Sequence, residues 1–130
     1  MHDIDSLRPI LRAAWGADTC DPHDRPDWHP GNPARGQCGV TALVIQDLLG
    51  GDLILGEVYA GGVRTGYHYW NRLPGGREVD LTAGQFRPDE VVTGGAVQQR
   101  DPGAPVRRCR AEYELLSSRV LAHRRDSVAG

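Results

Sequence analysis

The chain has 130 residues and a formal net charge of -2, which suits one domain over residues 1–130 and leaves no basic stripe for a nucleic-acid partner. All fifteen basic side chains are arginine, which excludes Schiff-base catalysis and the lysine of phosphate-binding loops. The longest apolar stretch, residues 40–49, is interrupted by polar side chains and no apolar leader opens the chain, so we expect a cytoplasmic protein with no membrane partner.

The first predicted element is an amphipathic helix over residues 4–15. Its apolar residues recur at helical spacing, with Asp5 or Ser6 as the cap and Pro9 in the first turn. Residues 16–36 follow with three glycines and four prolines, which predicts a long ordered loop without regular structure. Loops of this length often carry function, so this one is a candidate for a binding wall.

A central helix is expected from Cys38 to Leu49, because its apolar residues cover a wide face and Gly50-Gly51 supplies a stop. Segments rich in β-branched and aromatic residues come next, separated by glycine turns. They predict three consecutive antiparallel strands, at residues 53–60, 65–73 and 77–81. The predicted class is therefore α+β, with one helix packed on an antiparallel sheet.

The C-terminal third gives weaker patterns. Residues 86–105 are rich in Gly, Pro and Gln and are expected to wrap the surface without a strand. An edge strand is predicted at Val106–Arg110, followed by a last helix from Tyr113 to His123.

The candidate chemistry begins with Cys38, at the expected start of the central helix, where unpaired N–H groups and the helix dipole favour a thiolate. His68 lies in the middle of a predicted strand and is the leading candidate for its base. The turn at residues 74–76 pairs the strands so that Asp80 lies diagonal to His68 on the same face. Asp80 is then placed to orient the imidazole, as acyl transfer by a nucleophile, a base and an orienting acid requires. Gln37, beside the thiol, is a candidate oxyanion donor together with the backbone N–H of Cys38.

The strings NPARGQCGVTALVIQDLLGG and HYWNRLPGGREVDLTAGQF resemble the small bacterial YunG-like family over residues 28–86. The order Cys, His, Asp is similar to the wider papain and transglutaminase-like superfamily. That resemblance implies a helix-borne nucleophile packed on an antiparallel sheet, with thiol-based amide chemistry at Cys38, His68 and Asp80. Gln37 departs from the papain pattern, because it stands directly before the cysteine rather than several residues earlier.

A cleft wall is expected from the loop before the central helix. We predict that the side chains binding the substrate are Trp28, Asn32 and Arg35 from this loop and Trp70 from the second strand. Trp70 and its tyrosine neighbours also suit simple packing. Asn71 is an alternative partner for His68, although strand alternation points it to the other face.

The function we expect is a thiol-dependent amide hydrolase or acyltransferase that needs no cofactor and acts on a small molecule, a short peptide or a carrier-bound acyl group. Aromatic residues on an exposed strand face are compatible with a homodimer. One alternative is a catalytically silent binding module, which a Cys38 buried away from any cleft would favour. Another is a zinc-stabilised domain, in which the ligands would be Cys20, His23 and His29 with Cys38 or Cys109. Cys109 is otherwise expected to be structural or incidental.

Overall fold

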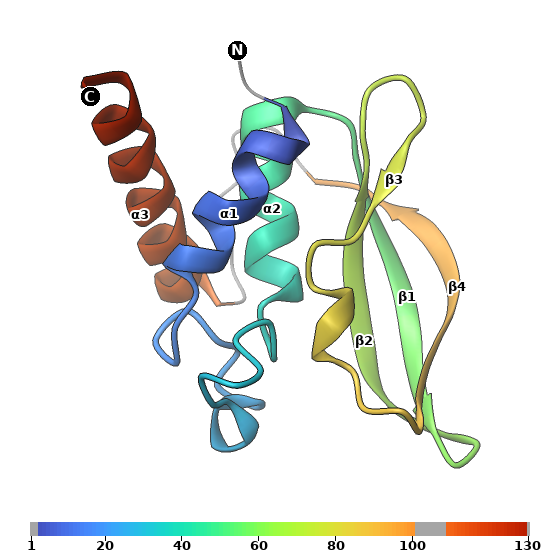
Figure 1. The fold of residues 1–130 in the computed structure, drawn as a ribbon. Coiled ribbons are helices and arrows are strands. Elements are labelled where there is room, and N and C mark those ends of the chain that lie inside the picture. Colours follow the sequence, from blue (N-terminus) through green and yellow to red (C-terminus); the bar gives the residue numbers. More distant parts are fainter. Residues whose placement is uncertain (1–2, 101–108, 130) are drawn as a thin grey trace.

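Three helices lie on one side of a curled antiparallel sheet in the computed structural model, which describes residues 3–100 and 109–129 (Figure 1). Helix α2 (Cys38–Leu49) is sandwiched between the sheet and the other two helices, α1 (Ile4–Ala14) and α3 (Arg110–Ala129). The α+β class is therefore confirmed. No helix in the described ranges combines the length and the apolar character that a membrane span needs.

Helix α1 begins at Ile4, as the apolar spacing predicts, but its cap differs from the prediction. Its cap is Asp3, whose carboxylate accepts the Ser6 backbone N–H at 2.8 Å, so the predicted cap at Asp5 or Ser6 is wrong. Ser6 instead completes a capping box from the third helical position. Pro9 lies inside the helix on its exposed side, where water can bind the carbonyl that loses its partner.

The main apolar cluster lies between the three helices and includes Val79 from the sheet, while Leu53, Ile54 and Val58 of the sheet are buried as well. Buried apolar residues at helical spacing on α1 meet those of α2 and α3, because each helix must cover its apolar face. The buried members of this cluster are Ile4, Leu7, Leu11, Ala14, Val40, Val44, Ile45, Val79, Leu116 and Val120. Helix α2 also packs against the sheet, so its contacts on both sides position Cys38, its first residue.

The sheet has the strand order β3-β2-β1-β4, and all of its pairings are antiparallel. Its strands are β1 (Asp52–Ala60), β2 (Val63–Arg72), β3 (Glu78–Val79) and β4 (Glu90–Gln98). The first two match the predicted hairpin, whereas the third is shorter than expected. Its register, with Asn71 opposite Val79, is the one that the turn at residues 74–76 predicts.

Strand β4 corrects the prediction that residues 86–105 hold no strand. It pairs with β1 along most of its length, with a register shift between Leu55 and Glu57. Gly94 and Gly95 hide the alternation that would have marked it as a strand. Gly95 has a φ of +129°, which favours glycine, and a side chain there would also press on the ring of Trp70.

The loop between α1 and α2 lies below the helical layer in Figure 1. It is irregular as predicted, apart from one 3-10 turn at Arg25–Asp27 and a bridge between His29 and Asn32. Of the predicted edge strand, residues 106–108 lie outside the described residues. Arg110 is already the first residue of α3, which is longer than the predicted helix.

Candidate active site

The segment that leads into α2 is fixed by close packing. Gly36 has a φ of +72°, and a Cβ there would collide with Sγ of the buried Cys20. Only glycine fits this conformation and this space without strain. The Gly36 N–H donates to Oε1 of Gln85 at 3.1 Å, so the turn before Cys38 is tied to the segment that follows β3.

Gln37 is fully buried and faces away from the thiol. Its Oε1 accepts a hydrogen bond from the Thr19 hydroxyl at 2.8 Å, and its Nε2 donates to the Gly16 carbonyl at 2.9 Å. The prediction of Gln37 as an oxyanion donor is therefore wrong, because its amide is used to hold the end of α1 against α2. Its role is to fix the position of the helix start.

Cys38 is half-buried at the N-terminus of α2. No side chain caps this helix, and within the described residues the backbone N–H of Cys38 has no hydrogen-bond partner. Free N–H groups and the positive end of the helix dipole both stabilise negative charge at this point. The thiol thus lies where an anion is favoured.

His68, on β2, makes the contact with Asp80 that the strand register predicts. Its Nε2 lies 2.6 Å from Oδ2 of Asp80. The other oxygen of Asp80 accepts the backbone N–H of Thr82 at 3.2 Å and its hydroxyl at 3.3 Å. Thr82 therefore holds the carboxylate, and the carboxylate holds the imidazole.

The ring of His68 is completely buried between two aromatic rings. Trp70 stacks on it at 5.7 Å between ring centroids, and Phe86 meets it edge-on at 4.7 Å. With Nε2 on Asp80, the second ring nitrogen, Nδ1, has no partner with full hydrogen-bond geometry. Cys38 is nevertheless close enough to act on the imidazole by hydrogen bonding and by charge. A buried Nδ1 beside a thiol is suited to exchange a proton with it.

The protonation of His68 is set by opposing effects. Burial lowers its pKa, but the hydrogen bond to Asp80, the hydrogen bond and charge of Cys38, and the charge of Asp80 outweigh burial and raise the pKa to about 9. Asp80 and Cys38 together keep the imidazole protonated at neutral pH.

Gln85 is a polar residue that the sequence did not single out. It is 5% exposed and belongs to the 3-10 turn Ala83–Gln85. While Oε1 accepts the Gly36 N–H, Nε2 donates to the Thr82 carbonyl at 3.1 Å and leaves its second hydrogen free. Gln85 thus links the Asp80–Thr82 segment to the turn before Cys38, and it also lines the pocket into which Cys38 opens.

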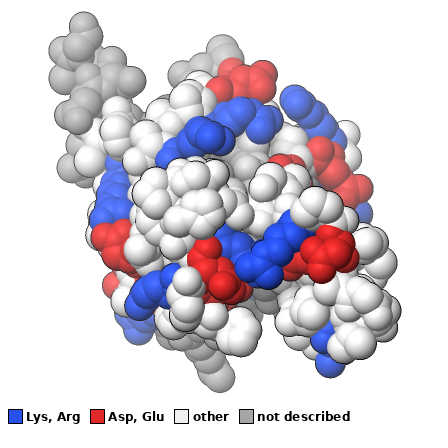
Figure 2. All heavy atoms as spheres, turned by 60° about the horizontal axis from the view of Figure 1, so that its bottom comes forward, with Lys and Arg blue, Asp and Glu red and all other residues white. Residues whose placement is uncertain are grey.

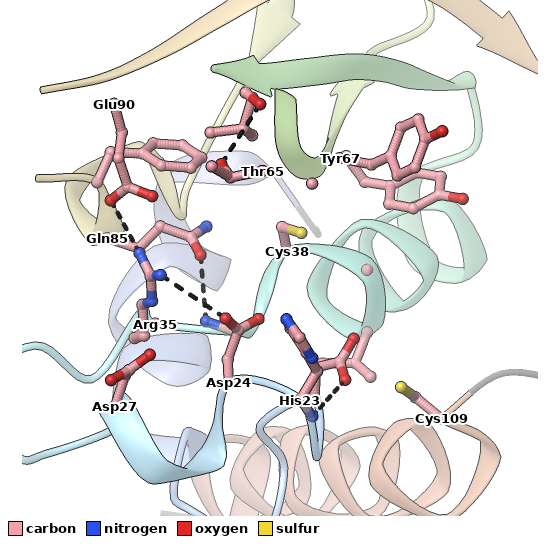
Figure 3. Close-up of a pocket in the computed structure, with 18 of the residues that line it drawn as sticks. His23, Asp24, Asp27, Arg35, Cys38, Thr65, Tyr67, Gln85, Glu90 and Cys109 are labelled. Atoms are coloured by element: carbon pink, nitrogen blue, oxygen red, sulfur yellow. Dashed lines mark hydrogen bonds and ion pairs between the residues drawn. The ribbon is translucent and has the colours of Figure 1, made fainter. Parts of the chain in front are cut away.

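That pocket has a volume of about 900 Å³ and runs between α2, the sheet and the long loop. In Figure 3, Cys38 lies between the charged side chains of Arg35, Asp24 and Glu90 on one side and Tyr67 on the other. Its volume is in the range of sites that hold a small-molecule ligand. Cys38 is therefore not buried away from a cleft. Seen from below, acidic and basic side chains lie next to one another, without a patch of one charge (Figure 2).

The comparisons with known proteins agree with the resemblance of the sequence motifs. A family model described as YunG protein matches residues 3–125. The chain belongs to the YunG family. A relative from Bacillus subtilis (strain 168), named uncharacterized protein YunG, is 33% identical over 84 residues, which are 65% of this chain. The match spans 64% of that relative's length. No solved structure matches this YunG-family chain.

The loop residues predicted to bind substrate are only partly found at the pocket of this YunG-family protein. Arg35 lines it, held by Glu90 at 3.0 Å and more loosely by Asp24. Trp28 does not line it and donates to the Pro33 carbonyl at 3.1 Å. Asn32 likewise lies behind the wall, where it donates to the Gln85 carbonyl at 3.0 Å. Of the three, only Arg35 is in a position to meet a ligand.

Trp70 is also misplaced by the sequence prediction. Its ring covers Gly56 and Gly95, and its Nε1 donates to Glu78 at 2.7 Å, outside the Cys38 pocket. Trp70 therefore packs the sheet and supports His68 from outside the Cys38 pocket. Asn71 points to the other face, as expected from alternation, and donates to the Ala42 carbonyl of α2 at 3.0 Å.

The alternative zinc site does not come together in this YunG-family chain. Cys20 is buried, and burial, followed by the charges of Asp24 and Asp21, raises its pKa to about 12, so it remains a thiol. Nδ1 of His29 accepts the Gly31 N–H. Over residues 3–100 and 109–129, no group of three or more His, Cys, Asp or Glu side chains is arranged to hold a metal ion.

Proposed function

We propose that this protein is a thiol-dependent amide hydrolase or acyltransferase acting on a small molecule or short peptide. Cys38 is the nucleophile, His68 is the general base and then the general acid, and Asp80 orients the imidazole. A likeness to the papain and transglutaminase-like superfamily forms part of this proposal. It is supported by a helix-borne cysteine packed against an antiparallel sheet that carries the histidine.

The observation that carries the proposal is the state of the His68 ring. Asp80 binds Nε2 at 2.6 Å, which fixes the ring orientation and leaves Nδ1 buried next to Cys38. Cys38 acts on this imidazole by hydrogen bonding and by charge, while Asp80 occupies the other ring nitrogen. A buried imidazole whose second neighbour is a half-exposed thiol supports proton transfer between the two groups.

The reaction follows from these positions. With His68 protonated, the proton of Sγ is already on Nδ1, and the thiolate of Cys38 attacks the carbonyl carbon of the substrate. Negative charge that develops on the carbonyl oxygen is stabilised by the free backbone N–H of Cys38 and the free Nε2 hydrogen of Gln85. The imidazolium then gives its proton to the leaving amine as the carbon–nitrogen bond breaks. Water or an acceptor amine, deprotonated by His68, releases the acyl group from Sγ and restores the thiolate of Cys38 beside the protonated His68.

A catalytically silent binding module is the alternative that the sequence left open. It is favoured by a cysteine buried away from the cleft, but Cys38 is half-exposed and lines the pocket. The geometry therefore supports the enzyme better than the binding module.

The proposal is tested with an activated ester that makes few demands on specificity, p-nitrophenyl acetate. We expect a burst of p-nitrophenolate stoichiometric with enzyme, and an acetyl group on Cys38 in the peptide mass spectrum. Cys38→Ser should abolish the burst, and Cys109→Ser, which removes another thiol that lines the same pocket, should leave it unchanged. Acetylation of Cys109 in place of Cys38, or a burst that survives Cys38→Ser, would refute the assignment.

A further inference from the structure

The pocket around Cys38 has two walls of different chemistry. On the side of α2 and the sheet it is lined by apolar and aromatic residues, namely Val40, Leu43, Leu53, Val58, Tyr67 and Tyr69. On the side of the long loop and the start of β4 it is lined by charged residues, among them Asp24, Asp27, Arg35 and Glu90. Cys38 lies between these two walls (Figure 3). A ligand attacked at its carbonyl would therefore extend in both directions.

Negative charge dominates the charged wall. The carboxylates Asp21, Asp24, Asp27, Asp89 and Glu90 line it together with Arg35 and Arg87, and a third arginine of the pocket, Arg100, is held by Asp47 at 2.7 Å. Arg35 is shared, since Glu90 holds it at 3.0 Å and Asp24 reaches it only at 3.7 Å. Arg87 is 3.7 Å from Asp27. The guanidinium groups of this wall are therefore already engaged by carboxylates, and neither is placed to attract an anionic ligand.

Asp24 has to share Arg35 with Glu90, which holds the guanidinium more closely. Its side chain is 28% exposed, which leaves it open to the pocket but largely out of water. Burial, and the like charges of Asp21 and Asp27, raise its pKa against the opposing effects of Arg35 and His23. A bound cation would compensate the negative charge of Asp24, which Arg35 compensates only in part because it also pairs with Glu90.

We infer that the substrate is an amphipathic cation, with an aromatic or branched aliphatic group on one side of the reacting carbonyl and an ammonium or guanidinium group on the other. The apolar group lies between α2 and the sheet, and the cation lies against Asp24. This inference rests on the proposed thiol chemistry at Cys38. It extends that proposal by naming the class of substrate and Asp24 as the residue that selects it.

The test compares thiol-directed methanethiosulfonates that differ only in the transferred group. The trimethylammonioethyl and sulfonatoethyl reagents form a cationic and anionic pair, and the benzyl and methyl reagents form an apolar pair. Rates at Cys38 are read by peptide mass spectrometry on the whole protein and divided by the rates of each reagent with N-acetylcysteine. We expect the cation to exceed the anion by at least ~10-fold, and benzyl to exceed methyl by at least ~5-fold.

Variants assign these preferences to the two walls. Asp24→Asn should reduce the charge preference to below ~3-fold, and Asp27→Asn should reduce it as well, since both carboxylates line the same wall. Asp52→Asn removes an equal charge from the start of β1, outside the pocket, and should leave the preference unchanged. Leu43→Ala should reduce the benzyl preference, whereas Leu121→Ala on the exposed side of α3 should not.

The outcomes separate the two proposals. A Cys38 that reacts rapidly with all four reagents, without preference, would overturn the amphipathic substrate and leave the thiol chemistry standing. A charge preference that falls equally in Asp24→Asn and Asp52→Asn would also overturn it, since the effect would then come from overall charge. A Cys38 that no reagent reaches in the folded protein would overturn both.

Discussion

The pH dependence of stability offers a quantitative test of the His68 site. In an unfolded chain histidine titrates near 6.5, whereas the pKa of folded His68 is about 9. Because the folded pKa is the higher one, protonation favours the folded state. The stabilisation is complete below about pH 6.5 and is lost as the pH rises through 9. The folded and unfolded pKa values differ by about 2.5, and each unit corresponds to about 1.36 kcal/mol. Protonated His68 therefore contributes about 3 kcal/mol to the free energy of unfolding.

The assay is urea unfolding at about pH 6 and about pH 10, comparing the wild type with His68→Gln and with His123→Gln, an exposed histidine of α3. We expect wild type and His123→Gln to lose about 3 kcal/mol more than His68→Gln over this range. An equal loss in all three proteins would show that His68 is not held in the protonated form, and would refute the reasoning. Asp80→Asn gives a second measure by NMR titration, since without the carboxylate burial should lower the pKa of His68.

Three further predictions concern the support of the site. Gly36→Ala should lower the free energy of unfolding by about 2–4 kcal/mol, because the backbone is left-handed there and the new Cβ collides with Cys20. Gly61→Ala is the control, since Gly61 also has a positive φ but open space around it, and it should cost about 1 kcal/mol. Urea unfolding measures both values. Gln85→Met should slow acylation of Cys38 by roughly 100-fold through loss of a donor, and acylation at the wild-type rate would contradict this role. Cys20 should resist iodoacetamide in the folded protein, as peptide mass spectrometry can check.

The parts of the site that the sequence predicted are those set by local geometry. A tight turn fixes the register of the two strands that it joins, so the pairing of Asn71 with Val79 and the contact between His68 and Asp80 followed from residues 74–76. The bounds of α2 could also be predicted from nearby residues, because apolar periodicity begins at Cys38 and a double glycine follows the last turn.

The parts that the sequence missed depend on tertiary packing. Strand β4 carries Gly94 and Gly95, which read as a turn, but Gly95 leaves space for Trp70 and the strand is held by pairing with β1. Gln37 seemed close to the thiol because it precedes it, yet the first turn of α2 directs it back to Gly16. Gln85, which lies 47 positions further along the chain than Cys38, reaches the pocket through the turn after β3. The feature that marks Gln85 as a site residue is that this polar side chain is buried, and the sequence alone does not show burial.

The central claim is that His68 activates Cys38, and alkylation by iodoacetamide tests it most directly. The rate of Cys38 modification, mapped by mass spectrometry, is compared between wild type and His68→Gln at about pH 6, where an ordinary thiol with a pKa near ~8.5 is almost entirely protonated. We expect modification at least ~10-fold faster than that of glutathione in the wild type, and loss of this advantage in His68→Gln. A Cys38 that reacts equally in both proteins, or only after unfolding, would contradict it.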